Sequence, residues 1–205
     1  MRVYTVFLVS LYGVNHEKIL VINANPKSQS LCQSIAEHYS QAAGLRHEVQ
    51  SIAMANMRFE LSLNEGYDKV LPLEPDLLEF QELIKWCDHL VIISPVWWGN
   101  IPAKFKGVID RTFLPGFAFQ YKGKKGGLEK LLTGRTSELI FTLDTPAFWY
   151  KYMKGNLIYK QLKNAVLGFS GIKNLSSTYF GPVLNSDEDI REKWLVKVQK
   201  LAKNI

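Results

Sequence analysis

Cysteine is scarce in this chain of 205 residues, which holds only Cys32 and Cys87. The two lie far apart and form no Cys-x-x-Cys motif, so the sequence predicts neither a metal site nor a disulfide framework. A reducing, cytoplasmic setting is the expectation. The four histidines are scattered as well and form no catalytic constellation.

Nucleotide-binding fingerprints and long apolar runs are also missing. Neither G-x-G-x-x-G nor G-x-x-x-x-G-K-S/T occurs, which excludes the usual dinucleotide and P-loop signatures. The apolar stretch MRVYTVFLVSLYGVNH at the start is too short to span a bilayer and has no small-x-small cleavage site. We interpret residues 1–17 as an extension of uncertain role before a single domain over residues 18–205, with no membrane insertion.

Acidic residues are few in the second half of the chain. Residues 1–100 contain 7 basic and 11 acidic residues, whereas residues 101–205 contain 18 basic and 8 acidic residues. This asymmetry indicates either lysine-rich solvated faces or attraction of an anionic ligand to one side of the molecule. Nucleic acid is disfavoured, because the lysines are spread over several predicted elements without a nucleic-acid motif.

Strand-like and helix-like segments alternate from Lys18 onward. Short apolar runs rich in Val and Ile suit strands that are buried on both faces of a parallel sheet. The predicted strands are 18–24, 47–53, 89–94, 135–144 and 174–180, and the predicted helices are 30–44, 75–88, 102–113, 156–169 and a last one capped by Ser186. The pattern predicts an α/β fold with an open, doubly wound sheet of five parallel strands and helices on both faces.

In such sheets, ligands bind outside the carboxyl ends of the strands, near the switch in strand order. Three loops therefore matter: residues 24–31, 94–101 and 143–150. The first, ANPKSQSL, offers the hydroxyls of Ser28 and Ser30 and free N–H groups at a helix N-terminus, which suits a phosphate. A plain serine-capped helix explains the same residues.

The second loop, SPVWWGN, places two of the five tryptophans directly after a buried strand. Trp97 or Trp98 can pack on the face of a flat ligand while main-chain N–H groups bind its edge. Core tryptophans that brace the following helix are the alternative.

The third loop, LDTPAFWYKY, carries four aromatic residues, and a further group, Phe117, Phe119 and Tyr121, follows the helix predicted at 102–113. So many aromatic residues outside regular elements indicate a homodimer contact. A stacking site at the dimer boundary would satisfy both interpretations, and we favour it.

The stretch PVWWGNIPAKFKGVIDRTFLPGFAF resembles the most specific motif of the flavodoxin-like NAD(P)H:quinone oxidoreductase family. EPDLLEFQELIKWCDHLV before it and LDTPAFWYKY after it are similar to one bacterial branch, the NAD(P)H dehydrogenase (quinone) branch. The resemblance runs from about Lys18 to the C-terminus. It implies a flavodoxin-like fold, a flavin (FAD or FMN) lying across the carboxyl ends of the strands, NAD(P)H as co-substrate and a homodimer.

The resemblance also implies site residues in this chain. The phosphate end of the flavin would be held by Asn25, Ser28, Ser30 and Leu31, and the isoalloxazine ring would be lined by Pro95, Val96, Trp97, Trp98 and Gly99. Its other edge would be closed by Asp144, Thr145 and Pro146. Phe119 and Tyr121 fall where family members place aromatic residues of the partner subunit over the substrate, and Phe117 and Trp149 are further substrate-binding candidates.

The chain departs from the family pattern near the cofactor. Ala24-Asn25-Pro26 replaces Gly-His-Pro, so a histidine contact near the phosphates is lost. Leu143-Asp144-Thr145-Pro146 replaces the Thr-Thr-Gly-Gly of the animal enzymes. The tyrosine–histidine pair proposed to relay charge in those enzymes has no counterpart at matching positions, and the catalytic candidates here are Tyr121, Tyr150 and Tyr152.

The implied function is a flavin-dependent NAD(P)H oxidoreductase that passes a hydride to a quinone or similar acceptor by a ping-pong cycle. Main-chain N–H groups of residues 96–99 and 144–147 are the expected hydrogen-bond donors to the flavin. Three alternatives stay open: a flavodoxin-type electron carrier, an ancillary regulatory flavoprotein of a potassium-efflux system, and a domain that kept the fold and lost the flavin.

Overall fold

The computed structural model describes residues 16–66, 68–69, 71–123 and 126–205. Apart from His16 and Glu17, the predicted extension lies outside the described residues. Across the described ranges, no helix is both long and apolar enough to cross a membrane.

Five parallel strands form the central sheet in the order β2-β1-β3-β6-β7. The strands are β1 (Lys18–Asn23), β2 (Glu48–Ala53), β3 (His89–Pro95), β6 (Thr136–Thr142) and β7 (Lys173–Phe180). Every residue of β3 is buried, as expected for a central strand that is covered on both faces. The strand order reverses between β1 and β3, so the switch point lies there. The predicted α/β class and five-stranded parallel sheet are confirmed.

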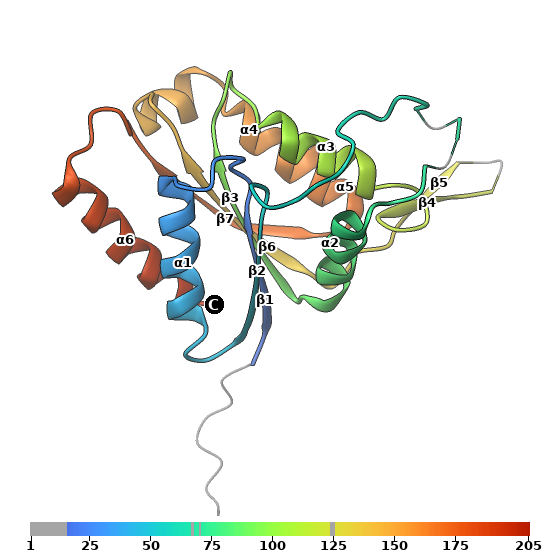
Figure 1. Cartoon of the computed structure of the whole chain (residues 1–205), viewed down its shortest axis with the longest axis horizontal. Helices are drawn as coiled ribbons and strands as arrows, with labels where there is room; N and C mark the ends of the chain where they lie inside the picture. Colours follow the sequence, from blue (N-terminus) through green and yellow to red (C-terminus); the bar gives the residue numbers. More distant parts are fainter. Residues whose placement is uncertain (1–15, 67, 70, 124–125) are drawn as a thin grey trace, which may run out of the picture.

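Two layers of helices cover the sheet (Figure 1). On one face, α1 (Leu31–Ala43) and α6 (Glu188–Ala202) pack on Ile19 and Val21 of β1. On the other face, α2 (Pro75–Trp86), α3 (Ala103–Thr112) and a helical stretch over residues 157–170 pack on Leu20 and Ile22. The alternation of side chains along β1 therefore supplies both cores.

The helical stretch at 157–170 differs from the single α-helix predicted there. It consists of α4 (Leu157–Lys160), a wider π-helical part (Gln161–Leu167) and α5 (Gly168–Ser170). A second π-helical turn, Trp149–Met153, lies in the aromatic loop after β6. Such turns are rare and concentrate near functional sites.

The caps of α1 and α6 are side-chain caps of the usual kind. The Ser30 hydroxyl accepts a hydrogen bond from the Gln33 N–H at 3.2 Å. At α6 the predicted cap was wrong by one residue: the Asp187 carboxylate accepts from the Ile190 N–H at 2.8 Å. The Ser186 hydroxyl instead donates to the Val183 carbonyl at 2.6 Å and accepts from Arg191 Nε at 2.9 Å.

A two-stranded antiparallel hairpin, β4 (Phe119–Lys122) and β5 (Gly127–Lys130), follows α3. It lies at the end of the molecule opposite α1 and α6 (Figure 1).

The buried Arg111 of α3 donates to the Glu60 and Pro72 carbonyls and to the Glu74 carboxylate, at 2.6, 3.2 and 2.8 Å. One guanidinium group thus holds the long β2–α2 loop against α3.

The amino edge of the sheet, where β1, β3 and β6 begin, is closed by buried polar groups. His89 lies against Thr136, with 2.7 Å between Nδ1 and Oγ1, and the buried His47 accepts from the Glu17 N–H at 3.3 Å. Between α1 and the sheet, the buried Glu138 carboxylate accepts from the Tyr39 hydroxyl at 3.1 Å and the Ser176 hydroxyl at 2.7 Å. The sequence showed Glu138 only as a charge inside an apolar strand.

Candidate functional site

The carboxyl edge of the sheet, where β1, β3 and β6 end, gathers the three predicted loops. Ala24 N–H donates to the Ile93 carbonyl at 2.8 Å and joins the first loop to β3. Val96 N–H donates to the Thr142 carbonyl at 2.8 Å, and this bond joins the second loop to β6. The three loops therefore leave the sheet side by side.

The first loop forms a turn that leads into α1. Asn25 is buried, and its side-chain oxygen accepts from the Lys27 N–H at 3.0 Å. Within the described chain, the N–H groups of Gln29, Ser30 and Leu31 meet no acceptor. The first turns of α1 and α3 contain no acidic residue, whereas α2 and α6 each begin with acidic residues. An acid-free helix N-terminus with free donors suits an anion.

A cavity of about 800 Å³ begins at this loop. Its lining includes Ser28 and Ser30 from the loop, Asn56 from the segment after β2, and Arg191 from α6. Sequence reasoning missed Arg191, because about 160 residues separate it from the loop and only the packing of α6 beside α1 brings it there. Its Nε donates to the Ser186 hydroxyl at 2.9 Å, which fixes the guanidinium near the serines.

The second loop is a tight turn from Trp97 to Asn100. The main-chain N–H of each of these two residues donates to the carbonyl of the other at 2.9 Å. Trp98 and Gly99, at the centre, have φ values of 51° and 77°, the left-handed region that a two-residue turn of this type requires. Trp98 is fully exposed and Trp97 is about half exposed. The core-tryptophan alternative is therefore wrong for Trp98.

The expectation for main-chain donors needs a correction. Val96 N–H is bonded to the Thr142 carbonyl and Trp97 N–H to the Asn100 carbonyl, so neither is free for a ligand. Pro146 has no N–H. In the part of the chain that the structure describes, Trp98, Gly99 and Thr145 keep N–H groups without an acceptor.

The third loop carries Asp144, Thr145 and Pro146 beyond the end of β6. The Asp144 carboxylate accepts from the Leu184 N–H at 2.9 Å, so it fastens this loop to the segment after β7. Pro146 is exposed and Thr145 partly so. Their position beside the second loop agrees with the expected shared cleft.

The aromatic residues after this loop divide into exposed and buried ones. Phe148, Trp149 and Tyr152 are exposed, and the rings of Phe148 and Tyr152 lie 5.0 Å apart. Tyr150 is buried, and its hydroxyl donates to the Gly99 carbonyl at 3.2 Å. The one proton of Tyr150 is thus in use, and the structure does not offer it to a substrate.

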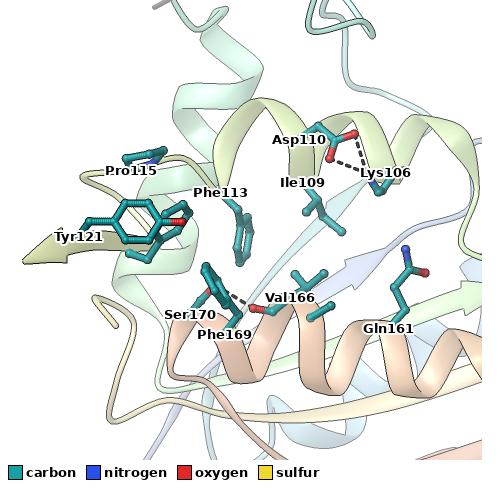
Figure 2. A pocket seen from close by; sticks show the side chains of 12 residues that line it. Lys106, Ile109, Asp110, Phe113, Pro115, Tyr121, Gln161, Val166, Phe169 and Ser170 are labelled. Atoms are coloured by element: carbon teal, nitrogen blue, oxygen red, sulfur yellow. Dashed lines mark hydrogen bonds and ion pairs between the residues drawn. The ribbon is translucent and has the colours of Figure 1, made fainter. Parts of the chain in front are cut away.

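The remaining substrate candidates lie on another face. Phe119 and Tyr121 of β4 line a cavity of about 570 Å³ between the hairpin, α3 and the helical stretch at 157–170. Figure 2 shows Tyr121, Phe113 and Phe169 around this space, with the Lys106–Asp110 ion pair at its rim. None of the carboxyl-edge residues lines it. Phe117 does not line this cavity. Its ring packs edge-on against the ring of Phe113, with 6.1 Å between the ring centroids.

The described residues contain no group of three or more His, Cys, Asp or Glu side chains arranged to hold a metal ion. What the carboxyl edge offers is a set of donors for an anion beside a projecting aromatic turn. An open parallel sheet with this strand order defines a protein of the doubly wound α/β class, in which ligands bind at this edge.

The chain belongs to the protein family described as having a flavodoxin-like fold, whose sequence pattern matches residues 17–202. An uncharacterized NAD(P)H oxidoreductase of Haemophilus influenzae is 27% identical over 87% of this chain and 89% of its own length. The rat ribosyldihydronicotinamide dehydrogenase [quinone] is 29% identical over 70% of this chain, and the match spans 63% of the rat protein.

A solved structure gives the same fold. The FMN-dependent NADH-azoreductase of Bacillus anthracis, in complex with FMN, superposes with a TM-score of 0.70 over 91% of this chain and 98% of that chain. The two sequences are 20% identical, so this likeness concerns the fold alone.

Proposed function

We propose that this protein is a flavin-dependent oxidoreductase that takes a hydride from NAD(P)H and passes it to a quinone or a similar acceptor. One observation carries the proposal: the acid-free N-terminus of α1 and the projecting Trp98 turn lie at the same edge of the sheet. The names of two relatives support the donor and the acceptor, NAD(P)H for the Haemophilus protein and a quinone for the rat protein.

The residues at the carboxyl edge fit a flavin. The hydroxyls of Ser28 and Ser30 and the free N–H groups of Ser30 and Leu31 would bind the phosphate end. Asn25 would shape the turn, and Arg191 would lie beside it. The cavity continues from these serines past Ala53 and Asn56 to a total of about 800 Å³. This space suits the adenosine half of FAD, so we favour FAD over FMN.

The flat ring would lie between the second and third loops. Pro95 and Val96 would support it from the end of β3, Trp97, Trp98 and Gly99 would cover it, and Asp144, Thr145 and Pro146 would flank its other edge. A bound flavin supplies the hydride transfer in both directions. The chain itself orients the ring, excludes water with the tryptophans, and offers the N–H groups of Trp98, Gly99 and Thr145 where negative charge develops.

The substrate side requires a second copy of the chain. Phe119 and Tyr121 lie in a cavity that contains none of the flavin-edge loops, and Trp149 and Tyr152 are exposed at those loops. A two-fold dimer in which each hairpin cavity covers the partner's Trp98 turn would complete two equal sites. Phe169, which packs on Phe119 at 4.9 Å, joins the substrate-binding candidates.

The charge around the third loop favours an anionic donor. Residues 145–186 contain five lysines and no acidic residue. Such a one-signed surface draws a dinucleotide toward the site and raises its rate of association. The cytoplasm is the proposed setting, since Cys32 and Cys87 are both buried and unpaired and thiols persist in a reducing compartment.

The test is an absorption spectrum of the purified protein before and after anaerobic NADPH, with the heat-released cofactor identified by chromatography. A flavin spectrum that bleaches with NADPH and returns with a quinone is the expected result, and released FAD would support the extended cavity. A bound flavin that NADPH does not bleach would favour an electron carrier. A colourless protein that takes up neither flavin would overturn the proposal.

A further inference from the structure

The Tyr150 side chain joins the tryptophan turn to the start of α4. Its hydroxyl donates to the Gly99 carbonyl at 3.2 Å and accepts from the Ile158 N–H at 3.2 Å. A phenol has one proton and two lone pairs, so the proton and one lone pair are in use. The hydroxyl is therefore a bridge between two main-chain segments that lie about 60 residues apart in the sequence.

Both bridged segments contain an unusual backbone conformation. Trp98 and Asn156 have φ values of 51° and 52°, and in the described ranges they are the non-glycine residues with positive φ. Each lies within two residues of a hydrogen bond to the Tyr150 hydroxyl. Such conformations cost free energy and persist where neighbouring contacts fix them.

Other contacts hold the α4 side of this bridge in place. The Tyr179 hydroxyl donates to the Asn156 side-chain oxygen at 2.7 Å, and the Asn156 N–H donates to the Tyr150 carbonyl at 3.3 Å. The Trp98 turn has fewer supports, since Trp98 itself is fully exposed. The hydrogen bond from the Tyr150 hydroxyl to the Gly99 carbonyl thus links the Trp98 turn directly to the aromatic loop after β6.

The environment of Tyr150 is poor for proton transfer. Burial raises the pKa of its hydroxyl, and the hydrogen bond from the Ile158 N–H opposes this only in part. The side chain is 6% exposed, and the exposed Tyr152 nearby is better placed to meet a substrate.

We infer that Tyr150 is a positioning residue: its hydroxyl sets the Trp98 turn in the place and conformation that the flavin ring requires, and it does not touch the substrate. The claim that the turn is positioned for a flavin rests on the proposed function. The mechanical part, the bridge between Gly99 and Ile158, stands on the geometry alone.

The test compares Tyr150→Phe with Tyr159→Phe, a matched loss of a tyrosine hydroxyl on α4 outside the bridge. In Tyr150→Phe, amide hydrogen exchange should accelerate at Ile158 and at Trp97 and Asn100, whose N–H groups close the turn. Flavin should bind about tenfold more weakly, as expected for lost hydrogen bonds to buried groups. The pH profile of kcat should keep its shape. Tyr159→Phe should match the wild type in all three measurements.

Two outcomes would overturn the inference. One is unchanged exchange at Ile158 and in the turn. The other is loss of a limb of the pH profile in Tyr150→Phe, which would make Tyr150 a proton donor. If the wild type binds no flavin, the proposed function fails, and the exchange measurement alone decides the bridge.

A second variant covers the case in which Tyr150→Phe does not fold. Tyr179→Phe removes the contact to Asn156 and leaves the Tyr150 hydroxyl intact. It should accelerate exchange around Asn156 and Ile158 and weaken flavin binding by a smaller factor than Tyr150→Phe. If amide exchange accelerates at Asn156 but not at Ile158, the result would contradict a rigid link through the bridge.

Discussion

The two edges of the central sheet treat their polar groups differently. At the amino edge, His47 and His89 are buried, and one ring nitrogen of each lies in hydrogen-bonding contact with a neighbouring group, while the buried His89 Nε2 meets no partner in the described chain. At the carboxyl edge, N–H groups of Ser30 and Trp98 stay without an acceptor in the described chain, and Trp98 stands in solvent. Donors without a protein acceptor and an aromatic ring in solvent are accessible to a ligand, so the carboxyl edge suits binding, whereas the buried histidines of the amino edge belong to the fold.

The largest effect should come from the buried carboxylate on the folding side of this comparison. Glu138→Ala removes the acceptor of the Tyr39 and Ser176 hydroxyls and should lower the free energy of unfolding by about 3 kcal/mol. Urea unfolding measures it, with Glu138→Gln, which keeps one oxygen, as the milder control. Flavin affinity should stay within about twofold of the wild type. A large loss of affinity in folded protein would contradict the assignment of Glu138 to folding alone.

The next effect is a pH dependence at the amino edge. Burial, and secondarily the nearby His47, lowers the pKa of His89 to about 4 from its usual 6.5. Between pH 6.5 and about 4, His89 is therefore protonated in the unfolded chain and neutral in the folded protein. The free energy of unfolding consequently decreases as the pH falls through this window.

From pH 7 to pH 5 this loss should be about 2 kcal/mol in the free energy of unfolding. Urea titrations of the wild type and of His89→Gln, which cannot titrate, measure it. The variant should show a flatter pH dependence. Equal slopes for both proteins would remove His89 as the cause.

Trp98→Ala tests the carboxyl edge by itself. Since the side chain is fully exposed, its removal should change the free energy of unfolding by less than about 0.5 kcal/mol. The loss of stacking area should weaken flavin binding about tenfold, or about 1.4 kcal/mol. Equilibrium dialysis and urea unfolding measure the two quantities. A collapse of stability with flavin retained would show that the tryptophan belongs to the fold.

The smallest effect compares two helix caps directly. Ser30→Ala and Asp187→Ala each remove one cap hydrogen bond and should each cost about 1 kcal/mol of stability. Ser30→Ala should also weaken flavin binding, and by more than Asp187→Ala, because Ser30 itself lines the proposed phosphate site whereas α6 reaches it through Arg191. Equal binding by both variants would leave Ser30 with the role of a plain cap.

Periodicity and turn residues were enough to predict the sheet, because each buried strand is a local apolar run such as HLVIIS. The loops of the site were also local, since Ser28, Trp98 and Asp144 directly follow strands. Arg191 could not be predicted in this way, because it reaches the site through helix packing. The bonds that consume the Val96 and Trp97 N–H groups depend on strand pairing and turn closure, which the residue types do not specify.

The exposure of Trp98 gives the protein an optical reporter of its own. An indole in water emits at longer wavelength than a buried one, and a flavin stacked on it would accept its excitation energy. Filling of the site should therefore quench the red edge of the tryptophan emission, while the signal from the half-buried Trp86 and Trp194 changes less. Ligands that compete for the ring position can be ranked without a label, by the emission that the exposed tryptophans of this edge, Trp97, Trp98 and Trp149, recover.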